Sequence, residues 1–197
     1  MTSRTEKGKP TMMPIGLLMI EHRLIERAIA VVSRQIELIA AGGAPDPRDI
    51  DGIVDFLHTY ADRYHHGKEE DILFRDLARH GLSPEHEIVM RRLIEEHEYA
   101  RRTAASLGDA NSRFTSGDPT GLAQVEGYLR ALEGLYPAHI DLEDHHFFRP
   151  IMAYFTPDEQ QAMLEEFREF DRELVHERYR DVVARLSARA TATSAES

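Results

Sequence analysis

Histidines and carboxylates that recur one helical turn apart are the residues of this chain best suited to bind a metal ion. Within residues 48–79, His65 and Glu69 are four positions apart, so at about 100° per residue they share one face of a helix. His66 and Glu70 repeat this spacing on the neighbouring face. The face of His65 continues into apolar residues and is expected to turn inward, where unpaired imidazoles and carboxylates would be costly unless a metal bound them. We therefore expect His65 and Glu69 to form a ligand pair, with His66 and Glu70 as the alternative.

A later segment holds a second set of the same residue types, with His139, Glu143 and His146 at positions i, i+4 and i+7. Two further segments each contribute one histidine directly after a glutamate, His22 and His97. Any one of these histidines alone would be an ordinary core residue. Together they supply one histidine from each of four helices, with a carboxylate one turn beyond the histidine on alternate helices. This pattern is typical of a metal pair held in the core of a helical bundle.

The segments that carry these residues have the periodicity of helices. Apolar residues recur three and four positions apart, and no segment alternates with period two. Pro137 lies inside the fourth helix and should bend it just ahead of His139. The expected fold is all-α: an up-down antiparallel four-helix bundle with an additional C-terminal helix. The expected helices cover residues 14–41, 48–79, 83–108, a segment that starts after Pro119, and 156–189.

The chain has 197 residues and no linker-like stretch, which favours one domain. The two ends are polar and offer nothing to bury. We expect a single domain over residues 12–189, between flexible tails at 1–11 and 190–197.

Composition narrows the chemistry and the partners. The absence of cysteine excludes disulfide scaffolds, iron–sulfur clusters and thiol catalysis. A formal charge of −11 repels phosphate backbones and anionic lipid surfaces. The apolar run Met12–Ile20 lacks a signal-peptide cleavage pattern, and no stretch approaches the roughly 18 to 20 apolar residues that span a bilayer. We expect a cytoplasmic protein that binds neither nucleic acid nor membranes.

The stretch DRYHHGKEEDILF, from Asp62 to Phe74, and the stretch HIDLED from His139 resemble the second and fourth helices of the hemerythrin-like proteins of the HHE cation-binding class. The order Glu-His, His-His-x-x-Glu-Glu, Glu-His and His-x-x-x-Glu extends the resemblance over residues 14–155. It implies a non-haem centre of two irons per chain. By this resemblance one iron would be held by His22, His65 and a bridging Glu69, and the other by His97, His139 and Glu143.

The third helix departs from the pattern of animal-type hemerythrins, which are similar but place two histidines four residues apart there. In this chain Leu93 and Arg101 occupy the positions four residues from His97. The site is therefore one imidazole short. Either His66 or His146 fills the gap, or a coordination position is open to an exogenous ligand.

Mixed imidazole and carboxylate ligation suits iron, manganese or zinc. The resemblance implies iron, with zinc or manganese as the alternative. The first functional hypothesis is a binding protein that takes up dioxygen, nitric oxide or peroxide for sensing, storage or protection. The alternative is a diiron enzyme with peroxidase-like, catalase-like or ferroxidase activity. The sequence assigns no role to His58, which shares the face of His65, or to His176 on the fifth helix.

Overall fold

The computed structural model describes residues 13–172, and in this part of the chain all regular elements are helices joined by short turns, without strands. The predicted all-α class is therefore confirmed. The tails, His176 and the predicted end of the fifth helix lie outside the described residues. The elements are α1 (Pro14–Ala40), α2 (Pro47–Phe56), the π-helices η1 (Leu57–His66) and η2 (Glu69–Phe74), α3 (Arg75–Leu77), α4 (Pro84–Thr115), α5 (Gly121–Asp141), the π-helix η3 (Leu142–Phe147), α6 (Phe148–Ile151), the 3₁₀ turn η4 (Met152–Tyr154) and a helix over residues 157–172.

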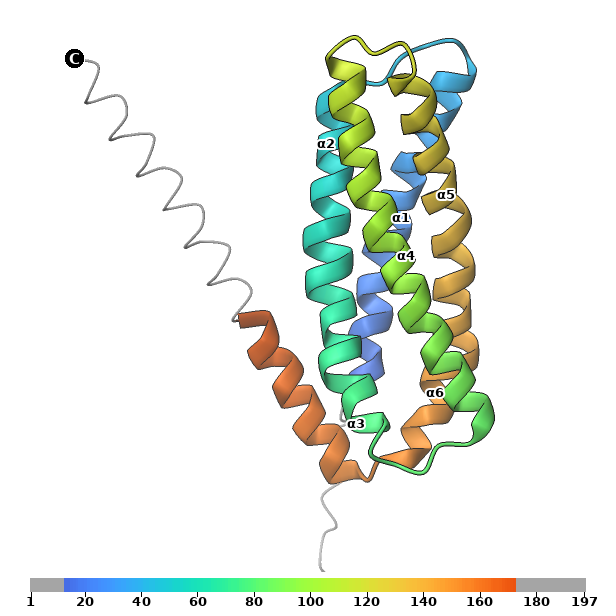
Figure 1. Ribbon diagram of the computed structural model, residues 1–197. Helices are drawn as coiled ribbons and strands as arrows, with labels where there is room; N and C mark the ends of the chain where they lie inside the picture. The colour runs from blue at the N-terminus through green and yellow to red at the C-terminus, as the bar shows by residue number, and fades with distance from the viewer. Residues whose placement is uncertain (1–12, 173–197) are drawn as a thin grey trace, which may run out of the picture.

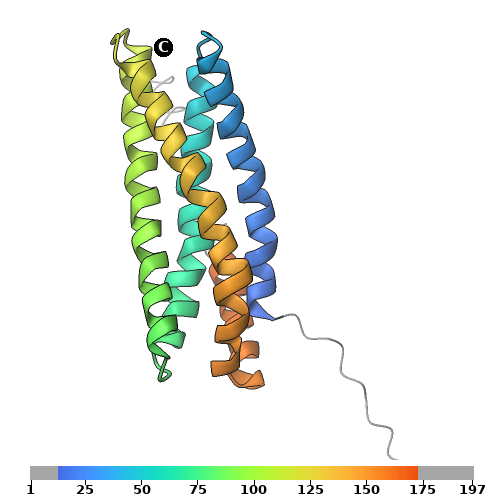
Figure 2. The ribbon, with the colours of Figure 1, turned by 90° about the vertical axis from the view of Figure 1, so that its right-hand side faces the viewer.

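The long helices lie side by side in a bundle (Figures 1 and 2). α4 packs against α5 and α2, and α1 packs against α5 and α2. The turns after α1 and after α4 lie at one end of the bundle, whereas the turn between α3 and α4 lies at the other end, beside α6 (Figure 1). The helix of residues 157–172 begins at the end where α6 lies (Figure 1). No helix within residues 13–172 is both long and apolar enough to cross a membrane.

Capping side chains explain where several helices begin. Ser83 accepts a hydrogen bond at Oγ from the backbone N–H of His86, 3.3 Å away, ahead of a proline at the first position of α4. The helix of residues 157–172 starts with a reciprocal pair in which Thr156 and Glu159 each accept from the other's backbone N–H. Both helices begin within one residue of the expected positions 83 and 156.

The structure changes one expectation about the helices. α4 does not fade near Gly108 but continues to Thr115, because Leu107 and Ala110 carry its buried face through that point. Pro137 lies within α5 as expected, and the helix continues to Asp141.

Two apolar clusters fill the bundle, and the histidines and carboxylates lie between them. On α1, Leu18 belongs to one cluster and Ile25 to the other, with His22 between them. The same order holds on α4, where His97 separates Leu93 from Ala100. The polar side chains are thus shielded from water on two sides by apolar packing, which lowers the local dielectric and strengthens their mutual interactions.

Candidate metal centre

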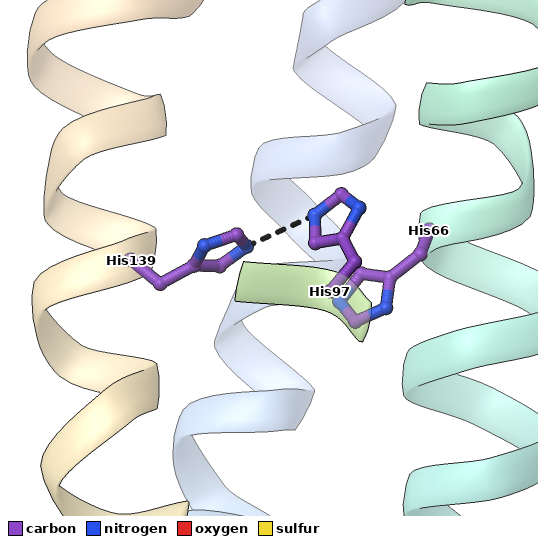
Figure 3. Close-up of side chains that lie close together, drawn as sticks. All are labelled: His66, His97 and His139. Atoms are coloured by element: carbon purple, nitrogen blue, oxygen red, sulfur yellow. Dashed lines mark hydrogen bonds between the residues drawn. The ribbon is translucent and has the colours of Figure 1, made fainter. Parts of the chain in front are cut away.

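Two groups of buried histidines and carboxylates lie in the layer between the apolar clusters. The two-imidazole group consists of His22, His65, Glu69 and Glu143, and the three-histidine group of His66, His97 and His139. Within each group one nitrogen or oxygen per residue lies within 4.8 Å of the others, a spacing that could hold a metal ion. Figure 3 shows the rings of the three-histidine group converging from η1, α4 and α5. The Nε2 atoms of His97 and His139 are 3.2 Å apart.

Glu69 reaches both groups. Its Oε1 lies 3.4 Å from Nε2 of His65, and its Oε2 lies 3.4 Å from Nε2 of His97. Burial, with the nearby Glu143 carboxylate, raises the pKa of Glu69 well above its ordinary value. This carboxylate has the geometry to bridge two cations, and without one its burial favours the neutral form.

Glu143 reaches both groups as well. Its Oε2 lies 3.2 Å from Nε2 of His22 and 3.4 Å from Nε2 of His139, and its Oε1 lies 3.8 Å from Nε2 of His97. Burial acts to raise the pKa of Glu143, but the surrounding imidazoles outweigh it and hold that pKa well below its ordinary value. Positive charge in this layer therefore stabilises the ionised carboxylate.

Unpaired polar atoms test whether a metal fits this layer. The Nε2 atoms of His22 and His65 and all four carboxylate oxygens of Glu69 and Glu143 are buried and make no hydrogen bond. Each such atom costs free energy, since it has lost its water and gained no partner. Nitrogen and oxygen donors of these types suit iron, manganese or zinc, so a cation of this class would satisfy all six atoms.

The Nδ1 atoms of four of the five histidines each hydrogen-bond to a carboxylate from another helix. An Nδ1–H that donates to a carboxylate leaves the Nε2 lone pair free to bind a metal, and it fixes the orientation of the ring. His66 differs, because its Nδ1 lies 3.5 Å from Asp62 Oδ1 and makes no hydrogen bond. The four pairs are His22 with Asp144 at 2.7 Å, His65 with Glu21 at 2.9 Å, His97 with Glu70 at 2.7 Å and His139 with Glu96 at 2.8 Å.

Cationic side chains neutralise these outer carboxylates in turn. Arg101 contacts Glu70 at 2.5 Å and also Asp62, the carboxylate nearest to Nδ1 of His66, at 2.6 Å. The remaining pairs are Arg23 with Asp144, Lys68 with Glu21, and Arg92 with Glu96. The orientation of four of the five imidazoles thus depends on a carboxylate that is itself held by a second ion pair.

Individual imidazoles of the layer differ in how readily they hold a proton, and both directions of pKa shift occur within each group. Burial acts to lower the pKa of His22, but the carboxylates of Asp144 and Glu143 outweigh it and raise that pKa to about 9. Burial, with the adjacent His97 ring, lowers the pKa of His66 to about 3. His66 is therefore neutral at physiological pH and available as a ligand, whereas His22 carries a proton that a cation would have to displace.

The six residues singled out most strongly by the sequence all lie in this layer, but they divide differently from the expected arrangement. Glu143 groups with His22 and His65, where the resemblance implied that it would serve His97 and His139. Both carboxylates in fact contact imidazoles of both groups, so the division of ligands follows the histidines alone.

Of the two histidines proposed to fill the missing position, only His66 lies in the layer. Its ring is 1% exposed and stacks on the ring of His97 with the centroids 3.9 Å apart. His146 is 66% exposed and contacts Asp141 at 3.8 Å, because its position on η3 points it away from the bundle interior. His66 brings the number of imidazoles in the layer to five.

Sequence reasoning did not identify the outer carboxylates as hydrogen-bond partners of the histidines, and it missed the buried lysine. The Glu-His dipeptides did carry a signal, yet the glutamate of each dipeptide pairs with a histidine of another helix. Glu21 binds His65 rather than His22, and Glu96 binds His139 rather than His97. Nothing in the sequence marked Lys68, which is fully buried.

π-helical turns occur where the ligand-type residues lie. η1 ends at His66, η2 begins at Glu69 and η3 contains Glu143. Such turns are rare in helices and are frequent at functional sites, because they redirect side chains relative to an α-helical stripe. The α-helical periodicity used on the sequence does not reveal them.

A cavity of about 470 Å³ opens beside the three-histidine group. His66 and Tyr136, both buried, line it together with Arg101, while Asp55 and His58 lie at more exposed positions. His58 therefore lines this cavity and does not join either metal-ligand group.

The family profile described as the hemerythrin HHE cation binding domain matches residues 13–151, which include every residue of both groups. No curated protein and no solved structure shows a significant match. The resemblance inferred from the sequence is confirmed, and the chain belongs to the hemerythrin HHE cation-binding domain family.

Proposed function

We propose that this protein is a non-haem diiron protein that binds two irons between its two apolar clusters. One iron would be held by His66, His97 and His139, and the other by His22 and His65. Glu69 and Glu143 would bridge the two ions, and this observation carries the proposal: each carboxylate lies within 3.4 Å of an imidazole of both groups. We also propose that the bundle has the expected up-down antiparallel four-helix topology.

The donor count supports an open coordination position on one side. With both carboxylates bridging, the three-histidine group offers five protein donors and the two-imidazole group four. A metal that keeps an open position binds exogenous ligands. When bound, iron near His22 and His65 would supply that position to dioxygen, nitric oxide or peroxide. Phe148, fully buried and stacked at 5.8 Å on the ring of His22, helps to exclude water from this side.

The surrounding residues orient the metal-binding imidazoles and exclude water from the layer even when no ligand is bound. The outer carboxylates hold the Nδ1 protons of four imidazoles and so direct the Nε2 lone pairs inward. The apolar clusters on both sides keep the layer dry, which strengthens electrostatic interactions with a bound ligand. Sensing, storage or protection would all use this arrangement, in a protein that we expect to be cytoplasmic.

An enzyme is the second candidate, favoured by the cavity that reaches His66 and Tyr136. A small substrate such as peroxide could approach the centre there, and Tyr136 offers a buried hydroxyl at the inner wall. Catalytic consumption of peroxide, or oxidation of ferrous iron with turnover, would distinguish this function from reversible ligand binding.

Metal analysis with an optical spectrum tests the proposal. Protein reconstituted with ferrous iron without air, then exposed to air, should contain two irons per chain, and azide or nitric oxide should shift its absorption. His66→Ala should lose iron, whereas His146→Ala, with the same substitution at an exposed ring, should retain both ions. A stoichiometry of one zinc that persists after reconstitution with iron would contradict the diiron proposal.

A further inference from the structure

The helix of residues 157–172 follows the segment that the family profile matches, which ends at residue 151. It nevertheless packs into the bundle. Phe167 is fully buried in the apolar cluster that contains Leu18 and Phe148. Phe170 lies over Gly67, so closely that a β-carbon at position 67 would come within 2.7 Å of the ring. This contact touches the chain between His66 and Glu69, two residues of the candidate metal centre.

Lys68 connects this helix to the bundle interior. Its side chain is fully buried, which is rare for lysine unless its charge is paired. The ammonium group contacts the carboxylate of Glu21 on α1 and lies 2.9 Å from Oδ1 of Asp171 on the C-terminal helix. It also lies 3.8 Å from the centre of the Tyr64 ring, a cation–π contact. The lysine thus joins three segments of the chain.

Glu21 carries the connection onward to the metal centre. One carboxylate oxygen binds Lys68, and the other accepts a hydrogen bond of 2.9 Å from Nδ1 of His65. The Nε2 of the same ring faces Glu69 at 3.4 Å. A continuous series of charged contacts therefore runs from Asp171 to a residue of the two-imidazole group.

We propose that Asp171 and Lys68 are positioning residues of the metal centre, so that docking of residues 157–172 sets how firmly His65 holds its metal. This inference rests on the proposed function, since it concerns the iron at the two-imidazole group. Asp171 shares the charge of Lys68 and so leaves the Glu21 carboxylate a stronger hydrogen-bond acceptor. Glu21 then polarises the Nδ1–H of His65, which makes Nε2 a stronger donor.

Loss of Asp171 has a defined consequence in this arrangement. Lys68 would keep Glu21 as its sole carboxylate partner among those described. Its undivided positive charge would make the Glu21 carboxylate a weaker hydrogen-bond acceptor for Nδ1 of His65. Removing a carboxylate that directly supports a metal-bound histidine typically costs 10- to 100-fold in metal affinity. Asp171 acts one contact farther away, so we expect about a 10-fold loss, the lower end of that range.

The test compares Asp171→Asn with Glu169→Gln, a matched amide substitution on the same helix at a residue that is exposed and pairs with Arg172. The first readout is metal loss: each full-length protein, loaded with iron, is challenged with a chelator and the release of the two ions is followed. Asp171→Asn should release one of its two irons about 10-fold faster than wild type, whereas Glu169→Gln should match wild type. Equal release from Asp171→Asn and wild type would overturn the proposal.

The second readout needs no metal. Acetylation of lysines in the metal-free protein, measured by mass spectrometry, should leave Lys68 protected in wild type and in Glu169→Gln but label it in Asp171→Asn. Phe170→Ala, which loosens the helix without removing a charge, should give the same labelling and the same faster release of iron. Labelling of Lys68 with unchanged iron release would show that the helix only covers the lysine, and would overturn the positioning role. A wild-type protein that protects Lys68 but binds no iron pair would instead contradict the proposed function, and with it this role.

Discussion

Glu69→Ala and Glu70→Ala form a matched pair that tests which carboxylate binds the metal. The residues are adjacent on the same helix, yet Glu69 is fully buried with its two oxygens each 3.4 Å from an imidazole Nε2, one in each group. Glu70 instead binds the outer Nδ1 of His97 and pairs with Arg101. Glu69→Ala would therefore remove one donor from each of two ions, whereas Glu70→Ala would only loosen one imidazole.

The magnitudes follow from these positions. Loss of an outer partner such as Glu70 should weaken metal binding 10- to 100-fold, about 1.4 to 2.7 kcal/mol. Glu69→Ala should exceed 100-fold, since a direct donor to both ions is lost. Without metal the order reverses, because both oxygens of Glu69 are buried without hydrogen bonds. Its removal relieves that cost and should leave the metal-free protein at least as stable as wild type, apart from the cavity created.

Metal content at a fixed concentration of free iron, and thermal unfolding with and without chelator, measure both effects. Glu69→Ala should retain fewer than two irons under conditions where Glu70→Ala retains both, and chelator should change its melting temperature little. Equal metal loss from the two variants, or greater loss from Glu70→Ala, would refute the assignment and indicate His66 with Glu70 as the ligand pair.

Three further predictions concern stability. Iron at 100-fold above its dissociation constant should stabilise the wild-type bundle by about 2.7 kcal/mol per site, which corresponds to a rise of about 5–10 °C in melting temperature; equal melting of iron-loaded and chelated protein would exclude a structural metal. Gly121→Ala should destabilise the protein by about 1–3 kcal/mol in urea unfolding, because its β-carbon would lie 2.5 Å from the backbone of α4. Gly127→Ala, in the same helix with nothing within 4 Å, should stabilise it by about 0.5–1 kcal/mol, and similar effects from both would contradict the packing argument. Asn111→Ala should cost about 1–3 kcal/mol, since its buried amide donates to Pro47 O at 2.9 Å and Asp51 Oδ1 at 2.7 Å; an unchanged urea midpoint would show that these bonds contribute nothing.

The sequence predicted the helical class and the residues of the inner layer because both depend on local periodicity. His65 and Glu69 are separated by one turn and continue into Ile72 and Leu73, so the direction of the buried stripe follows from spacing alone. For His66 the same spacing indicates an inward position only as an alternative to that of His65. In an α-helix its side chain would point about 100° away from that of its neighbour, and the π-helical turn of η1 is not encoded in an apolar repeat.

The outer carboxylates depend on how the helices rotate relative to one another. Glu21 and His22 are neighbours in sequence, yet they point to different sides of α1. Glu21 binds His65 of η1, whereas His22 binds Asp144 of η3. Spacing along one helix contains no information about such contacts. These contacts are set by the packing of the apolar clusters on either side of the layer, which fixes the rotation of each helix about its own axis.

The balance of charge in this layer explains why a bundle would tolerate so many buried ionisable groups. The five outer carboxylates face four cationic side chains, and the imidazoles that they orient are neutral ligands once metal is bound. The two inner carboxylates contact imidazoles, but neither pairs with a lysine or an arginine among the contacts described. Burial of a carboxylate charge is costly. Two divalent cations shared by Glu69 and Glu143 would offset that cost for both carboxylates. The outer carboxylates are Glu21, Asp62, Glu70, Glu96 and Asp144, their cations are Arg23, Lys68, Arg92 and Arg101, and the inner carboxylates are Glu69 and Glu143.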